Sequence, residues 1–105
     1  MYARVMTGEL KPGDEERFFK VIRDQVIPRA SKLNGFSGGY WLRDLESSKV
    51  LGVTLYDSEE TLRASAEQAD RIREEASRAA GIEPPTFHSY EVIASVAEEA
   101  VKKAA

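Results

Sequence analysis

Hydrophobic residues recur along this chain with two different periods. They alternate with polar residues over 2–10, and the stretches 36–44, 49–56 and 86–94 are rich in strand-forming residues, so the pattern predicts four β-strands. They recur every three or four residues from Asp14 to about Leu33 and again from Asp57 to Gly81, which is typical of helices that bury one face. The resulting order β-α-β-β-α-β predicts a ferredoxin-like domain of the α+β class, with both helices on one face of a four-stranded antiparallel sheet.

Proline, glycine and short polar residues mark where these elements bend or begin. Pro28 lacks a backbone N–H and disfavours helical angles at the residue before it, so we expect a kink or break in the first helix near position 27. The Gly38-Gly39 pair predicts a bulge in the second strand. Asp57 with Glu60 predicts a capping box at the start of the second helix.

The third strand is hydrophobic on both faces. Leu51, Val53 and Leu55 point to one side of the sheet, and the alternate positions, which include Val50 and Tyr56, point to the other. The two helices cover only one of these faces. A second copy of the same sheet is the simplest cover for the other, so we expect a homodimer with an apolar sheet-to-sheet interface.

Composition narrows the class of protein further. The 105 residues suit one domain, which we place at 1–94, followed by a tail at 95–105 that is either frayed or docked on the partner subunit. The chain has no cysteine, a formal net charge of −3 and scattered basic residues, so we expect no disulfide and no nucleic-acid partner. No hydrophobic run reaches the ~20 residues of a membrane span, and the chain opens directly into a strand pattern. We therefore expect a cytoplasmic protein with no membrane partner.

Several short motifs occur in a characteristic order. Lys11-Pro12-Gly13 precedes the first helix, Pro28 lies late in it, Asn34-Gly35-Phe36 follows it, and Tyr56-Asp57-Ser58-Glu59 closes the third strand. With this element order, residues 2–94 resemble the antibiotic biosynthesis monooxygenase domains of the dimeric α/β-barrel superfamily. The resemblance implies a dimeric α/β barrel with a pocket between sheet and helices. Known members include cofactor-independent oxygenases that make quinones in polyketide pathways and enzymes that degrade heme.

The residues that heme-degrading members use are missing here. The resemblance places their strand-one Asn, their Trp at the end of strand three and their helix-two His at Thr7, Tyr56 and about Ala66. Heme degradation is therefore disfavoured.

Tyr56 is the first candidate for a catalytic residue, because the resemblance implies that it is the pocket aromatic. The alternative is a core tyrosine with a satisfied hydroxyl. His88 is the only histidine, the residue type that exchanges protons near neutral pH, which suits a proton abstraction before oxygen attack. A lone histidine on a strand is nevertheless more often structural. His88 and Tyr90 share one face of their strand by alternation, so they either act together or pack together.

Trp41 and Arg4 each have two possible roles. Trp41 faces opposite to Tyr40 on an expected edge strand, where it anchors the dimer or walls the pocket, and the dimer role is preferred. Arg4 either stabilises an anionic intermediate or pairs with Glu91, and pairing is the default. The charged run at 71–75 is interpreted as a solvated helix surface.

The first helix completes the set of candidates. Phe18, Phe19 and Ile22 are core residues by periodicity, and the resemblance implies that they also line the pocket. The ligand-binding candidates are thus Tyr56, Thr7, Tyr90, Trp41, Arg4, Phe19 and Ile22, and the catalytic candidates are His88 and Tyr56.

Three functions remain open. The first is a cofactor-independent monooxygenase that acts on a small aromatic or polyketide-like molecule, with His88 or an ionised substrate hydroxyl starting electron transfer to oxygen. The second is a non-catalytic or stress-related homodimer that binds a small apolar or aromatic molecule, and the third is a structural association module. One histidine, no cysteine and no glycine-rich phosphate loop predict no metal, nucleotide or flavin cofactor.

Overall fold

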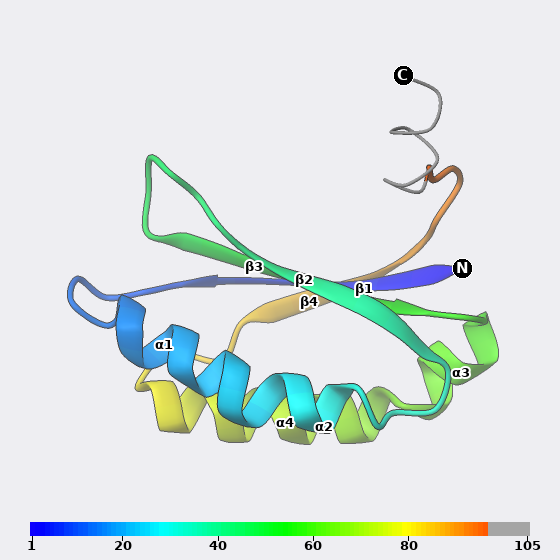
Figure 1. Ribbon diagram of the computed structural model, residues 1–105, viewed down its shortest axis with the longest axis horizontal. Coiled ribbons are helices and arrows are strands. Elements are labelled where there is room, and N and C mark those ends of the chain that lie inside the picture. The colour runs from blue at the N-terminus through cyan, green and yellow to red at the C-terminus, as the bar shows by residue number, and fades with distance from the viewer. Residues whose placement is uncertain (97–105) are drawn as a thin grey trace.

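The computed structural model describes residues 1–96 and has the expected ferredoxin-like α+β fold. Within these residues four strands form one antiparallel sheet, and the helices lie together on one of its faces (Figure 1). The elements in chain order are β1 (Tyr2–Glu9), α1 (Glu15–Val21), the π-helical segment η1 (Ile22–Val26), α2 (Ile27–Ala30), β2 (Phe36–Arg43), β3 (Lys49–Tyr56), α3 (Glu59–Ala64), α4 (Ala66–Ala80) and β4 (Thr86–Glu91). Most of the tail predicted at 95–105 lies outside the described residues.

The sheet has the strand order β2-β3-β1-β4, with antiparallel pairing throughout. The two central strands are β1 and β3, and β2 and β4 form the edges. The pairing of β2 with β3 shifts register between Phe36 and Gly38, so the bulge expected at the glycine pair is present. The last strand ends at Glu91, earlier than the predicted end at position 94, because Glu91 pairs with Tyr2, the first residue of β1, and beyond it only the Val92 N–H bonds to the Met1 carbonyl.

The first helix is irregular where the sequence predicts it, but it does not break. A π-helical turn, η1, lies between α1 and α2, and the N–H of Ile27 bonds to the carbonyl of Ile22 five residues earlier. Pro28 follows at once and cannot donate a bond back into this turn. The wider turn thus absorbs the missing N–H, and the helix ends at Ala30, earlier than the predicted end near Leu33.

The second helix begins with a different cap from the predicted one. Ser58 and Thr61 form the capping box, with the Thr61 N–H donating to Ser58 Oγ at 3.1 Å. Asp57 is not available for this role, because its N–H bonds to the carbonyl of Gly35 and its carboxylate accepts from the hydroxyl of Ser37. The prediction of an Asp57 cap is therefore wrong by one residue.

This second helix is also interrupted at Ser65, which separates α3 from α4. It ends as predicted at Gly81, whose left-handed conformation (φ 71°) terminates α4.

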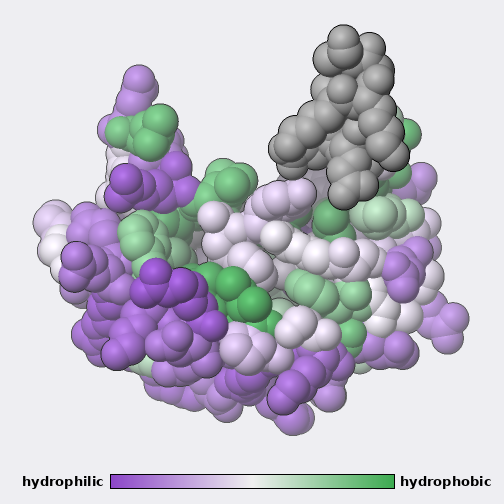
Figure 2. Space-filling model, viewed as in Figure 1, coloured by the Kyte–Doolittle hydropathy of each residue, from purple (hydrophilic) through white to green (hydrophobic). Residues whose placement is uncertain are grey.

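The hydrophobic core lies between the sheet and the helices. Tyr56 at the end of β3 is its most deeply buried large side chain, with 1% of its surface exposed. Leu62 of α3 and Ile72 of α4 belong to the same buried cluster. Figure 2 shows that the outer side of the helices is mainly hydrophilic, whereas hydrophobic surface gathers along the sheet and next to it.

Candidate functional site

A small apolar cavity lies between the sheet and the helices. The centres of water molecules could occupy about 70 Å³ of it, which is room for roughly five waters. At ~30 Å³ per water this corresponds to about 150 Å³, the size of an apolar cavity that holds one benzene ring. Its lining includes Arg4, Met6, Gly52, Thr54 and Tyr56 from the central strands, Trp41 from β2, and Phe18, Ile22, Val26, Ile72 and Arg73 from the helices.

Tyr56 and Arg4 form a hydrogen-bonded polar part of the cavity wall. Arg4 lies on β1 with only 3% of its surface exposed, and its Nη1 donates to the Tyr56 hydroxyl at 2.7 Å. Its Nη2 donates to the carbonyl of Leu62 at 2.7 Å, and its guanidinium carbon lies 4.9 Å from the centre of the Tyr56 ring. The expected pairing of Arg4 with Glu91 is not formed, because Arg4 points under the helices, whereas Glu91 is exposed at the edge of the sheet.

Trp41 lies over two glycines on the helix-facing side of the sheet. A methyl group at Gly52 would lie 3.2 Å from the indole Nε1, and one at Gly39 would lie 3.2 Å from its Cη2. The bare backbone of these two residues therefore makes room for the ring. Trp41 lines the cavity and not the open face on which the dimer contact was expected, which corrects the preferred role.

An open groove continues from the cavity between the first helix and β2. It measures about 640 Å³ on the same scale, and Phe18, Ile22 and Trp41 line both spaces. Phe19 lines only the groove, where the Arg43 guanidinium lies 5.7 Å from its ring centre. Three side chains thus separate a one-ring cavity from a groove that could take a larger molecule.

Thr7, His88 and Tyr90 lie on the opposite face of the sheet. His88 pairs with Val5 and Tyr90 with Ala3, so by strand alternation they point away from Arg4 and the helices. All three are exposed. His88 and Tyr90 share one face as predicted. The sheet separates these two residues and Thr7 from Tyr56, so these three site candidates do not line the cavity.

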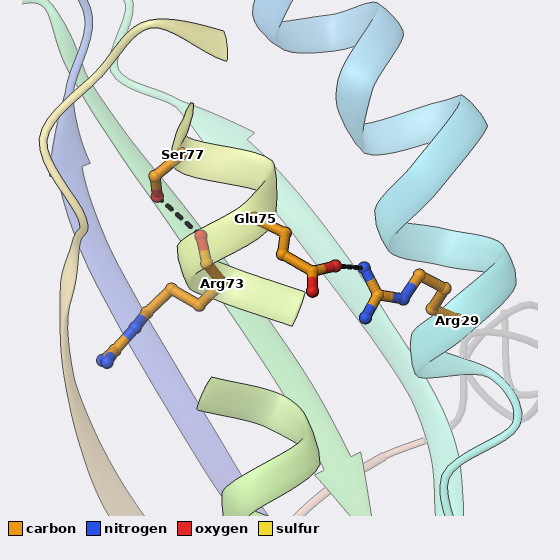
Figure 3. A network of polar contacts seen from close by, with 4 residues as sticks. All are labelled: Arg29, Arg73, Glu75 and Ser77. Atoms are coloured by element: carbon orange, nitrogen blue, oxygen red, sulfur yellow. Dashed lines mark hydrogen bonds and ion pairs between the residues drawn. The ribbon is translucent and has the colours of Figure 1, made fainter. Parts of the chain in front are cut away.

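Arg73 of α4 is a cavity residue that the sequence analysis missed. Its guanidinium lies 4.5 Å from the ring centre of Phe87 on β4, and Figure 3 shows the side chain reaching from α4 toward the strands, away from Arg29. Glu75 on the same helix pairs with Arg29 instead, linking α4 to α2. The helical spacing of Arg73 from Ala69 and Ala76, which also line the cavity, was the available signal, but its position within a charged run favoured solvent.

The described residues were also compared with the requirements of a metal site and of a membrane-spanning helix. Residues 1–96 contain no cluster of three or more histidine, cysteine or acidic side chains placed to hold a metal ion. None of the helices in this range has the length and apolar character needed to cross a membrane.

Solved structures with related folds include two oxygenases. The ActVA-Orf6 monooxygenase of Streptomyces coelicolor, solved with nanaomycin D, has a TM-score of 0.71 and 16% identity over 91% of this chain and 90% of its own. SnoaB, a cofactor-independent oxygenase of Streptomyces nogalater, has a TM-score of 0.71 and 12% identity over 92% of this chain and 97% of its own. The chain has the fold of the antibiotic biosynthesis monooxygenases. At these identities the likeness establishes the fold alone.

The same fold also occurs in proteins named for other processes. A Bacillus halodurans protein described as an ethyl tert-butyl ether d (ethd) family protein has a TM-score of 0.68 and 19% identity over 89% of this chain and 100% of its own. By sequence, the chain is 30% identical over 76 residues to the uncharacterized Mycobacterium tuberculosis proteins MT2635 and Rv2558, and it spans 32% of their length. No model of a known protein family matches the sequence.

Proposed function

We propose that this chain is an antibiotic biosynthesis monooxygenase-type enzyme that oxidises a small aromatic molecule without a cofactor. The observation that carries the proposal is the apolar cavity between sheet and helices, with the hydrogen-bonded Tyr56 and Arg4 as its polar wall. Its fold neighbours include named oxygenases, one of them cofactor-independent. An apolar pocket with a few convergent polar groups is the usual form of a small-molecule site.

In this proposal the substrate itself supplies the electrons. A phenol loses its hydroxyl hydrogen and one ring hydrogen and gains one oxygen atom to become a quinone, while the second atom of O₂ leaves as water; in anthrone the ring CH₂ supplies both hydrogens. Arg4 and Tyr56 would stabilise the ionised hydroxyl from which the electron transfer starts, since preorganised donors are most effective where water is excluded. His88 has no part in this step, because it lies on the other face of the sheet.

The chain is also proposed to act as a homodimer through the open face of the sheet. No helix among residues 1–96 covers this face, and it carries large exposed side chains: Tyr40 (64%), Leu42 (48%), Leu51 (38%) and Tyr90 (52%). Apolar side chains on a sheet face favour burial against a matching face, and two-fold symmetry supplies one. The second sheet would close the α/β barrel, with Thr7, His88 and Tyr90 at the interface.

A second candidate function is ligand binding without turnover. The cavity lining contains no histidine, aspartate, glutamate or lysine, so no side chain of the described chain is placed there as a general base. A substrate that does not ionise by itself would bind and remain unchanged. A carrier or sensor of a small aromatic molecule fits this lining as well.

Oxygen consumption separates the two functions. The protein is incubated in air with electron-rich single-ring and two-ring phenols and anthrone, without added cofactor, and oxygen uptake and products are measured. We expect oxygen uptake to match product formation one to one, and to fall at least tenfold in Tyr56→Phe. Binding of the same compounds without any product would establish the carrier function instead.

A further inference from the structure

Two arginines that line the cavity each have an N–H group without an acceptor. Nε of Arg4 and Nε of Arg73 are buried and have no hydrogen-bond partner in the part of the chain that the structure describes. Arg4 is the more extreme case, because 97% of its surface is buried and no carboxylate of residues 1–96 lies within ion-pair distance of it. A buried cation without a counter-ion destabilises a fold, so its presence points to an anion that the chain itself does not supply.

The hydroxyl of Tyr56 is a third donor without an acceptor. It accepts a hydrogen bond from Arg4 Nη1, so its own proton stays available for another group. Among the described residues no acceptor for that proton is found. An oxyanion in the cavity that accepts from Arg4 Nε and from the Tyr56 hydroxyl would satisfy both donors with charge-assisted bonds.

Arg73 lies close to this point, on the helix side of the cavity. Its guanidinium stacks on Phe87, which pairs with Met6 on β1, two residues from Arg4. Two residues of a strand span about 7 Å. Its pairing with Asp70 is loose, at 3.5 Å, and that carboxylate is 42% exposed. Both positive groups therefore approach the same part of the cavity, and most of the remaining lining is apolar.

We propose that the cavity takes an organic anion, a single-ring molecule whose one oxyanion, a carboxylate or an ionised phenol, is bound by Arg4, Tyr56 and Arg73. The inference rests on the site of the proposed function but not on any turnover there. The ring fits the one-ring apolar volume, and the oxyanion supplies the missing counter-charge. A neutral aromatic ligand would leave the charge of the Arg4 guanidinium without a counter-charge and would bind more weakly.

Calorimetric titration of matched probes tests the charge preference. Benzoate and benzyl alcohol share the ring and its one-carbon substituent but differ in charge. We expect benzoate to bind wild-type protein at least tenfold more tightly at neutral pH. 4-Nitrophenol, titrated on both sides of the pH at which its hydroxyl ionises, identifies the oxyanion: binding confined to the ionised form supports a phenolate ligand, and binding of benzoate alone supports a carboxylate.

Three variants test whether the preference for benzoate arises in the cavity. Arg4→Met and Arg73→Met should each lower the affinity for benzoate at least fivefold and leave that for benzyl alcohol within twofold. Arg63→Met, which removes an equal charge from a side chain that is 78% exposed on α3, is the matched control and should change neither. If Arg4→Met does not fold, the benzoate affinity of Arg73→Met and the preference of the wild-type protein for benzoate over benzyl alcohol test the inference.

Equal affinity for the two probes, no benzoate binding at millimolar concentration, or an unchanged preference in the cavity variants overturns the inference. A protein that prefers benzoate yet consumes no oxygen with any phenol contradicts only the proposed enzyme function.

Discussion

Arg4 Nη1 lies 2.7 Å from the hydroxyl of Tyr56, a residue 52 positions further along the chain. The same guanidinium donates from Nη2 to the carbonyl of Leu62 on α3. These bonds connect β1, the end of β3 and the helix α3. Since the pair also forms the polar wall of the cavity, it contributes both to the fold and to the proposed site, and mutations can separate the two contributions.

The stability of the Arg4–Tyr56 pair can be measured with a double-mutant cycle. Tyr56→Phe leaves a buried guanidinium donor without its partner, so we expect a loss of about 1–3 kcal/mol in the free energy of unfolding. The double variant Arg4→Met/Tyr56→Phe removes both polar groups together and should be more stable than Tyr56→Phe alone. Urea unfolding of the wild type, both single variants and the double variant gives the coupling energy. Simple addition of the two single losses would show that the pair is not coupled.

Gly52→Ala should fill the cavity from the sheet side. The added methyl would lie 2.9 Å from Met6 Cε and 3.2 Å from the Trp41 indole, so both side chains must shift. We expect overpacking to lower the free energy of unfolding by about 1–3 kcal/mol and benzoate affinity to fall at least tenfold. Trp41 is the only tryptophan of the chain, so its fluorescence reports the shift directly. The double variant Gly52→Ala/Met6→Ala relieves the closer contact and should recover part of the affinity; unchanged emission in Gly52→Ala would contradict this packing.

Leu42 and Leu51 lie opposite each other on the open face of the sheet, and a charge at either should break the proposed dimer. We expect Leu51→Lys to be a monomer at micromolar concentration by light scattering, because it buries a lysine in an apolar interface. Leu45→Lys is the control, since Leu45 is 89% exposed in the turn between β2 and β3 and should leave the dimer unchanged. A monomeric wild-type protein would refute the proposed assembly.

The response of this dimer to salt follows from the same apolar contact. Hydrophobic burial is little affected by ionic screening, so a tenfold rise in salt should leave the molecular mass unchanged. Light scattering at low and high salt measures this. Dissociation at high salt would mean that ion pairs, and not the leucine face, hold the subunits together.

Asp44 should make the β2–β3 turn sensitive to acid. The pKa of its carboxyl is lowered from the ordinary value of 3.8, first by the hydrogen bond from the Glu46 backbone N–H and then by the Ser47 side chain. Because the folded pKa lies below the unfolded one, this stabilisation is present above the unfolded pKa and is lost as the pH falls through the folded pKa. We expect the Glu46 amide resonance to titrate below pH 3.8. Asp44→Asn should abolish that titration, and an unaltered profile in the variant would argue against this contact.

Several features followed from the sequence because they depend on neighbours along the chain. The two-residue period of β3 assigns Leu51 and Tyr56 to opposite faces, since consecutive side chains of a strand alternate. Pro28 lacks an N–H wherever it stands, so an irregular first helix was predictable, although its π-helical form was not. The capping residue was harder to predict, because the contact of Asp57 with Gly35 joins segments that are distant in sequence.

The composition of the cavity was decided by the tertiary structure. Alternation places His88 and Tyr90 on one face of β4, but only the pairing of β4 with β1 decides that this face lies away from the helices. Likewise the sequence marks Arg4 as a mid-strand cation, whereas its partner is Tyr56 and not Glu91 because α3 folds back over the end of β3. The sequence by itself therefore determined the elements, their order and the two faces of each strand, through local sterics and hydrophobic period. Which face became the cavity, and which cations were buried in it, depended on long-range strand register and helix packing, because these bring together side chains that no local rule connects.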